Sequence, residues 1–136
     1  MIHEATFSVT FGDCDPAGIV FYPNMFRWMD ATFHARLRPF GGHASLCERL
    51  DIKGVGLARS EARFRSAVTD GDVLSVGIAS ETWSDRRFTL RYEGRVGDRL
   101  AFEGHEERCL FKIGAAGMFA GSTKDLQDIL EDSRDG

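Results

Sequence analysis

One short stretch of the sequence combines a carboxylate with the start of a helix. Residues 12–24 read Gly-Asp-Cys-Asp-Pro-Ala-Gly-Ile-Val-Phe-Tyr-Pro-Asn, so Asp15 precedes a proline and stands seven residues before Tyr22. Proline biases the preceding residue toward an extended backbone, which partly sets the direction of the Asp15 side chain. The helix begins near Tyr22, and its first backbone N–H groups have no intrahelical acceptors, so they can stabilise an oxyanion. A carboxylate beside an oxyanion site is the smallest set of groups that can catalyse acyl transfer to water.

The carboxylates of this stretch could instead have a purely structural role, and the stretch also contains a cysteine that could act as the nucleophile. An Asp-x-Asp-Pro run is typical of turns and caps, because short carboxylate side chains accept hydrogen bonds from nearby backbone N–H groups. Spacing alone leaves the choice between these two roles open. Cys14 lies between Asp13 and Asp15, and neighbouring negative charges raise the pKa of a thiol and suppress the reactive thiolate. We therefore favour Asp15 over Cys14 as the reactive group.

The composition narrows the classes of partner. Lys and Arg number 17 and Asp and Glu 21, which gives a net charge of −4, so there is no electrostatic reason to bind nucleic acid. Three widely spaced cysteines, without a histidine at ligand spacing, predict neither a disulfide framework nor a metal site. No segment approaches the roughly 20 apolar residues of a membrane helix, and the N-terminus lacks a signal-peptide pattern. We expect a cytoplasmic protein that does not bind membranes.

Periodicity in the first third of the chain predicts the elements that position the loop. Residues 2–11 are rich in strand formers and lead into the turn chemistry of residues 12–18. A helix is then predicted from near Tyr22 to the Gly41-Gly42 pair. Apolar residues recur along it at the spacing of one helical face, at Met25, Phe26, Met29, Phe33, Leu37 and Phe40. This wide apolar stripe predicts a buried helix.

The remainder of the chain alternates with period two. After a loop or short helix at residues 45–50, strands are predicted at 56–66, 73–83, 88–92 and 100–113, with a Gly97-Asp98 turn before the last. A short helix should follow the Ser122 cap, and residues 131–136 should be frayed. The whole chain, 1–136, therefore predicts one α+β domain, in which about five antiparallel strands wrap one central helix. One helix covers one sheet face, so we expect an oligomer that covers the rest.

Several segments resemble one enzyme family. Residues 12–20, Tyr22-Pro23-Asn24, Arg27-Trp28 and Asp30 are similar to the signature of the hot-dog-fold acyl-CoA thioesterases, specifically the 4-hydroxybenzoyl-CoA thioesterase type from Pseudomonas. The resemblance implies the hot-dog fold and hydrolysis of an aromatic acyl-CoA to the free acid and coenzyme A. Coenzyme A is then part of the substrate, and no cofactor or metal is implied. The family also implies an active site between subunits, in a homodimer or a homotetramer.

The resemblance also implies roles for single residues. Asp15 matches the catalytic carboxylate, which acts as nucleophile or general base, and the backbone N–H of Tyr22 matches the group that binds the thioester oxygen. Asp30 matches an acidic helix residue near the acyl ring, with a helix-surface hydrogen bond as the alternative. Gly18 is expected to allow close approach of the substrate to the backbone or a positive φ.

Two departures from the family pattern concern substrate binding. Where the Pseudomonas-type enzymes carry basic residues directly after the tryptophan, this chain has Ser84-Asp85, and its basic pair follows as Arg86 and Arg87. Arg86 and Arg87 are the expected contacts for the coenzyme A phosphates, with solvation of a hairpin end as the alternative. Arg63 and Arg65 are weaker candidates. The second departure, at residues 55–57, affects the expected acyl pocket.

Two other functions remain open at this point. A short-chain aliphatic acyl-CoA thioesterase would share much of the loop motif. A non-enzymatic acyl-CoA-binding module of the same fold would usually lack the carboxylate, whereas Asp15 is present.

Overall fold

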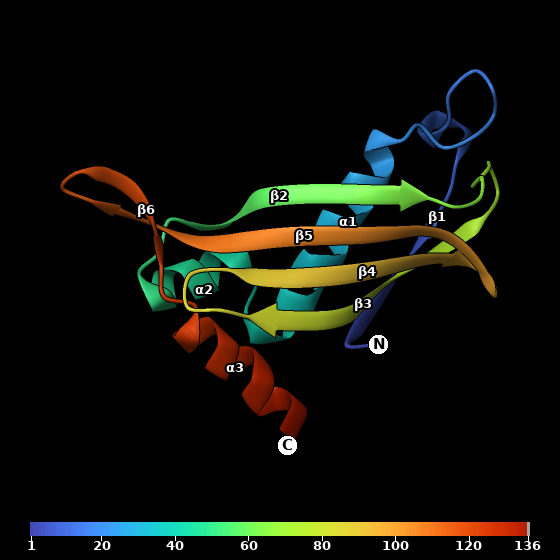
Figure 1. The fold of residues 1–136 in the computed structure, drawn as a ribbon. Helices are drawn as coiled ribbons and strands as arrows, with labels where there is room; N and C mark the ends of the chain where they lie inside the picture. Colours follow the sequence, from blue (N-terminus) through green and yellow to red (C-terminus); the bar gives the residue numbers. More distant parts are fainter. Residues whose placement is uncertain (136) are drawn as a thin grey trace.

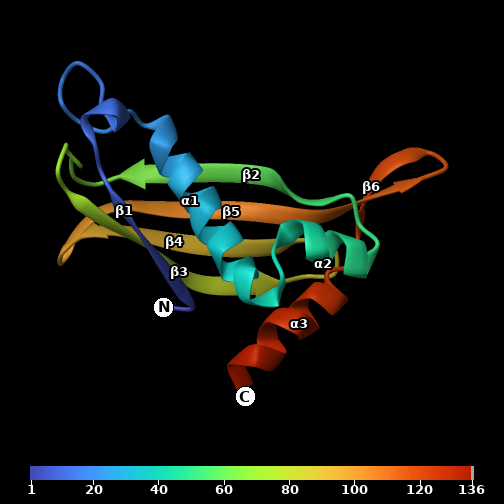
Figure 2. The same ribbon diagram turned by 180° about the vertical axis from the view of Figure 1, so that it is seen from behind.

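The computed structural model describes residues 1–135, in which one antiparallel sheet curls around a long helix (Figures 1 and 2). The strands are β1 (His3–Ser8), β2 (Gly54–Phe64), β3 (Val73–Trp83), β4 (Phe88–Val96), β5 (Arg99–Gly114) and β6 (Gly117–Gly121). Their order is β1-β3-β4-β5-β2, and β6 pairs with β5. The strand β2 is therefore an edge of the sheet. This arrangement confirms the α+β class and the central helix.

The central helix α1 (Pro23–Leu37) crosses one face of the sheet (Figure 2). Pro23 occupies its first turn, where a missing N–H costs no intrahelical bond. The predicted start is confirmed, but α1 ends at Leu37, earlier than predicted. A short 3₁₀ turn, η2 (Arg38–Phe40), continues to Gly41, whose φ of +99° ends the helical segment at the predicted glycine pair. One side of α1 joins a single apolar core with the inner face of the sheet, through Met25, Trp28, Met29, Phe33 and Leu37.

The period-two pattern correctly predicted the inner face of the sheet. Leu74, Val76 and Ile78 of β3 are fully buried, as a strand with one face on the core requires. The strand β6 was missed by the sequence analysis. Its residues are mostly exposed, so no apolar alternation marks it. It is defined instead by antiparallel backbone pairing with β5, in which Leu110 pairs with Gly121 at one end and Gly114 pairs with Gly117 at the other.

Two shorter helices lie near one end of the sheet. They are α2 (His43–Leu50) and α3 (Lys124–Asp135). The Ser122 hydroxyl accepts a hydrogen bond from the backbone N–H of Lys124 at 3.3 Å, in the expected capping region. Leu126 and Leu130 anchor α3 in the core, and the helix continues to Asp135. The expected frayed tail, 131–136, is thus helical as far as 135, and residue 136 lies outside the described residues.

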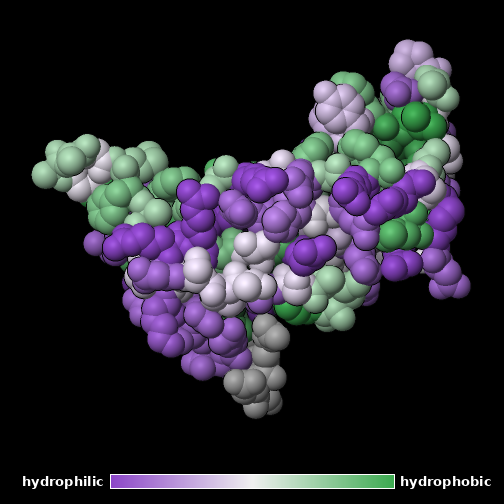
Figure 3. All heavy atoms as spheres, viewed as in Figure 1, coloured by the Kyte–Doolittle hydropathy of each residue, from purple (hydrophilic) through white to green (hydrophobic). Residues whose placement is uncertain are grey.

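The helix-free face of the sheet is polar. Figure 3 shows a hydrophilic band across the strands and apolar surface toward both ends of the molecule. Among the described residues, no helix is both long and apolar enough to cross a membrane.

Candidate active site

The loop before α1 is a closed turn that fixes Asp15. The backbone N–H of Asp15 donates to the Ile19 carbonyl at 2.9 Å, and the N–H of Gly18 donates to the Asp15 carbonyl at 2.9 Å. Gly18 has φ of +82°, the left-handed conformation that glycine adopts without strain. The positive φ expected at Gly18 is therefore confirmed.

The Asp15 carboxylate is held at one oxygen and open at the other. Its Oδ1 accepts a hydrogen bond from the Ala17 N–H at 2.9 Å. Its Oδ2 accepts none from any residue within 1–135. A carboxylate oriented through one oxygen keeps the other available to a substrate or to water.

The start of α1 offers one free donor to the same region. The Phe21 N–H donates to the Asp13 carbonyl at 2.9 Å, and the Asn24 N–H donates to Phe21 at 3.0 Å. Pro23 has no N–H. The Tyr22 N–H makes no hydrogen bond within the described chain, so it remains an unsatisfied donor at the positive end of the helix dipole.

Asp15 and Tyr22 line one groove of about 420 Å³. We call this the Asp15 groove. Its other walls are mostly apolar, formed by Ile19, Val20, Met25 and residues 64–68. A concave apolar wall with a few polar groups is the usual form of a small-molecule site. The pair that sequence reasoning singled out is thus brought together on a surface suited to an acyl group.

Cys14 is unsuited to act as the nucleophile. Burial raises the pKa of its thiol, and the charges of Asp70 and Asp13 raise it further. Its Sγ contacts the Thr10 carbonyl at 3.6 Å. A thiol with a raised pKa holds little thiolate near neutral pH.

Asp30 lies outside the Asp15 groove of the same chain. Its Oδ1 accepts a hydrogen bond from Arg108 Nη2 at 2.9 Å and lies 3.5 Å from His34 Nε2. The Asp30 side chain is still 47% exposed, so it can meet another ligand. The helix-surface hydrogen bond expected as the alternative is present.

Sequence reasoning missed the buried network that holds Asp30. The Arg108 side chain, 2% exposed, lies over the Phe33 ring at 4.1 Å and donates from Nε to Glu106 Oε1 at 3.0 Å. The Tyr92 hydroxyl donates to the same Glu106 oxygen. The alternation of buried residues in β5, in which Glu106 and Arg108 occupy inward positions, was the available signal.

Arg86 and Arg87 lie at the opposite end of the sheet from the Asp15 loop (Figure 1). Arg86 donates to the Ala120 carbonyl at 2.7 Å, and Arg87 forms an ion pair with Glu107 at 3.2 Å. One copy of the chain therefore does not bring these arginines to the Asp15 groove. Within residues 1–135, no group of His, Cys, Asp and Glu side chains is arranged to hold a metal ion.

Known proteins share both sequence and architecture with this chain. It is 34% identical over 89 residues to the 4-hydroxybenzoyl-CoA thioesterase of Pseudomonas sp. strain CBS-3, covering 62% of this chain and 61% of that enzyme. It is 30% identical over 107 residues to the 1,4-dihydroxy-2-naphthoyl-CoA hydrolase of Thermosynechococcus vestitus, covering 76% and 72% of the two chains. The chain thus matches about three fifths of the length of the Pseudomonas enzyme.

A solved structure extends this similarity over nearly the whole chain. The 4-hydroxybenzoyl-CoA thioesterase structure from Pseudomonas superposes with a TM-score of 0.76 at 26% identity, covering 94% of this chain and 99% of that one. No protein-family model matches the sequence. The shared sheet and central helix, together with the two sequence matches, show that the chain belongs to the hot-dog-fold acyl-CoA thioesterases.

Proposed function

We propose that this protein hydrolyses the thioester of an aromatic acyl-CoA to the free acid and coenzyme A. The observation that supports the proposal most directly is the Asp15 groove, in which an open carboxylate oxygen and the free N–H of Tyr22 share an apolar wall. The two relatives described above are named for a hydroxybenzoyl and a dihydroxynaphthoyl thioester, both hydroxylated aromatic acyl groups. A hydroxyaryl acyl group is therefore the substrate class we assign.

In this mechanism the two ends of the loop act on the same carbonyl. The Tyr22 N–H donates a hydrogen bond to the thioester oxygen, and the helix dipole stabilises the negative charge that develops there. Asp15 Oδ2 either attacks the carbonyl carbon, forming a mixed anhydride that water hydrolyses, or removes a proton from an attacking water. In both routes the C–S bond breaks and the coenzyme A sulfur leaves, so one water is consumed for each acid and thiol released.

Asp30 is proposed to select the hydroxyl group of the ring. Arg108 holds one carboxylate oxygen, and the half-exposed side chain leaves acceptor capacity for a ring hydroxyl. A substrate without that hydroxyl would leave the carboxylate short of a donor in a partly desolvated site. Because Asp30 does not line the Asp15 groove of its own chain, we assign this contact to a substrate bound between two copies.

The proposed assembly is a homodimer, alone or as half of a tetramer, formed along β2. This edge strand has unpaired backbone groups on one side, and its Leu57 and Phe64 are 45% and 53% exposed. An antiparallel register centred on Ser60 would place Arg59 opposite Glu61 of the partner subunit, which are opposite charges. It would also bring together two copies of Ser60, whose buried hydroxyl has no hydrogen-bond partner within residues 1–135.

A substrate panel tests the activity and its specificity together. The purified protein is incubated with 4-hydroxybenzoyl-, benzoyl-, acetyl-, propionyl- and butyryl-CoA, and released thiol is trapped with a chromogenic disulfide. We expect thiol release proportional to protein concentration and highest kcat/KM for the hydroxylated aromatic substrate. A tenfold preference for a short aliphatic substrate would contradict the aromatic assignment. Absence of thiol release with every substrate would favour a non-enzymatic acyl-CoA-binding module.

A further inference from the structure

His34 lies beside Asp30 on the partly exposed side of α1. The two residues are four positions apart, so their side chains share one face of the helix. His34 Nε2 lies 3.5 Å from Asp30 Oδ1, the oxygen that Arg108 already holds at 2.9 Å. The His34 side chain is 34% exposed, so part of its ring meets the solvent. A ligand that reaches Asp30 therefore also reaches His34.

The imidazole of His34 is packed against two other rings. Phe33 lies edge-on at a centroid distance of 5.5 Å, and His43 lies edge-on at 5.3 Å. His43 is itself fixed, because its Nε2 accepts a hydrogen bond from the Val55 N–H at 3.0 Å. Val55 begins the segment 55–57, which departs from the family pattern near the acyl pocket. The orientation of His34 thus depends on residues that are particular to this chain.

Asp30 and His34 both keep acceptor atoms for a ligand. Neither Asp30 Oδ2 nor a ring nitrogen of His34 accepts a hydrogen bond from any residue within 1–135. Burial lowers the pKa of His34, against the opposing charge of Asp30, so its ring is neutral near pH 7. A neutral imidazole has one N–H donor and one nitrogen acceptor. A carboxylate acceptor and an imidazole acceptor therefore stand side by side on α1.

Two hydroxyl groups on adjacent carbons of an aromatic ring match this pair of acceptors. Each hydroxyl donates one hydrogen bond, and the two oxygens lie close together along one edge of the ring. The 3.5 Å between the Asp30 and His34 atoms suits that arrangement, whereas hydroxyls on separated carbons point away from each other. A single hydroxyl would satisfy one acceptor and leave the other without a donor where the ligand excludes water.

We propose that Asp30 and His34 together select an acyl ring with hydroxyl groups on adjacent carbons, and that His34 accepts the hydrogen bond of the second hydroxyl. The inference rests on the proposed thioesterase function, because it takes the ligand to be an aromatic acyl-CoA bound between two copies of the chain. It narrows the hydroxyaryl class assigned above to a vicinal dihydroxyaryl group, such as 3,4-dihydroxybenzoyl.

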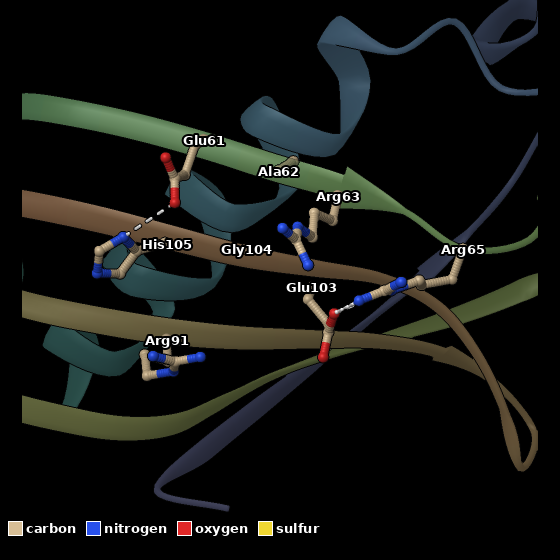
Figure 4. Close-up of a pocket in the computed structure, with 8 residues that line it drawn as sticks. All are labelled: Glu61, Ala62, Arg63, Arg65, Arg91, Glu103, Gly104 and His105. Carbon is tan, nitrogen blue, oxygen red and sulfur yellow. Dashed lines mark hydrogen bonds and ion pairs between the residues drawn. The ribbon is translucent and has the colours of Figure 1, made fainter.

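A larger hollow on the helix-free face of the sheet is unsuited to such a ring. It measures about 570 Å³, and its lining is mostly charged (Figure 4). Arg65 donates to Glu103 Oε2 from Nε at 3.0 Å and from Nη2 at 2.7 Å. These hydrogen bonds lower the pKa of Glu103, and the charges of Arg63 and Arg91 lower it further. The charges of this hollow therefore act on one another, and no apolar wall is left for an aryl group.

A comparison of isomeric substrates tests the proposal. The value of kcat/KM is measured for 3,4-dihydroxybenzoyl-, 3,5-dihydroxybenzoyl- and 4-hydroxybenzoyl-CoA. We expect the 3,4-dihydroxy substrate to exceed each of the others by at least about fivefold in the wild type. In His34→Phe this advantage should fall below about twofold, because phenylalanine keeps a ring against Phe33 and His43 but cannot accept a hydrogen bond. His34→Leu gives the same test if the melting temperature shows that His34→Phe is unfolded.

His105→Phe is the matched control. His105 Nδ1 lies 3.4 Å from Glu61 Oε1 on the helix-free face (Figure 4), so this variant removes a histidine from a different carboxylate pair. It should leave the advantage of the 3,4-dihydroxy substrate intact. An advantage that is absent from the wild type, or that persists in His34→Phe, would overturn the proposal. Equal kcat/KM for the 3,4 and 3,5 isomers would overturn it as well, since ring polarity alone would then explain the preference.

Binding without turnover separates this inference from the thioesterase proposal. Calorimetry gives the Kd of thioether analogues of the 3,4-dihydroxy and 4-hydroxy substrates, in which a methylene between the carbonyl and the sulfur prevents hydrolysis. A protein that releases no thiol, yet binds the 3,4-dihydroxy analogue more tightly in a way that His34→Phe abolishes, would contradict the thioesterase proposal and support the role of His34. An active protein that does not distinguish the two rings would contradict the role of His34 alone.

Discussion

Replacing Arg108 by methionine tests the buried network that holds Asp30. The substitution removes the guanidinium that bonds both Glu106 and Asp30, and it retains much of the apolar volume over Phe33. Glu106 is 1% exposed, and its Oε2 already has no hydrogen-bond partner within residues 1–135. Removing one partner of a buried ion pair typically costs about 3–5 kcal/mol, because the remaining charge stays desolvated. We expect the free energy of unfolding of Arg108→Met to fall by that amount.

Urea unfolding followed by circular dichroism measures this loss. Lys124→Met is the matched control, because Lys124 pairs with Asp128 at 2.9 Å on the exposed surface of α3 and exposed pairs contribute at most about 1 kcal/mol. The double variant Glu106→Gln/Arg108→Met should recover much of the stability, since it removes the uncompensated charge. A loss below about 1 kcal/mol in Arg108→Met would refute the reasoning that the cation compensates a buried carboxylate.

Three further predictions concern the assembly, the acyl group and pH. Sedimentation at micromolar concentration should give at least a dimer, and Ser60→Lys, which sets like charges across the proposed axis, should yield a species near 15.1 kDa; a monomeric wild type would contradict the β2 interface. The preference for 4-hydroxybenzoyl-CoA over benzoyl-CoA should be about 1–3 kcal/mol in kcat/KM, and Asp30→Ala should abolish most of it; an unchanged preference would exclude Asp30 as the selecting group. Burial lowers the pKa of His34 in the folded protein. The unfolded chain therefore binds more protons than the folded one as pH falls below about 6.5, and the free energy of unfolding declines there. This decline should be smaller in His34→Gln, and an equal decline would contradict its assignment to His34.

Sequence alone could predict the shape of the Asp15 loop because its parts are local. Asp15, Gly18 and Tyr22 lie within eight residues, and proline sterics, a glycine turn and a helix start constrain them without help from distant segments. The same holds for α1, whose apolar spacing marks its length, whose start is marked by Pro23, and whose helical segment stops at the Gly41-Gly42 pair. The sheet followed from period-two alternation wherever one face is buried.

The parts that sequence could not predict depend on long-range pairing. Asp30 meets Arg108 across 78 positions of the chain, and no local pattern specifies that contact. Arg63 and Arg91 come together only because β5 lies between β2 and β4. The separation of Arg86 and Arg87 from Asp15 likewise depends on where the β3–β4 turn falls relative to α1, which the order of elements leaves undetermined.

The most direct test of the account is the rate of Asp15→Asn on the preferred aromatic acyl-CoA. Asparagine keeps the shape of the side chain and its acceptor for the Ala17 N–H, but it can neither attack the thioester nor accept a proton from water. We predict that kcat falls by a factor of about 10² to 10⁴, while the Kd for coenzyme A and the melting temperature stay close to wild type. Asp98→Asn, in the exposed β4–β5 turn, should leave kcat unchanged. If Asp15→Asn keeps more than about a tenth of wild-type kcat, the central claim that Asp15 performs the chemistry is contradicted.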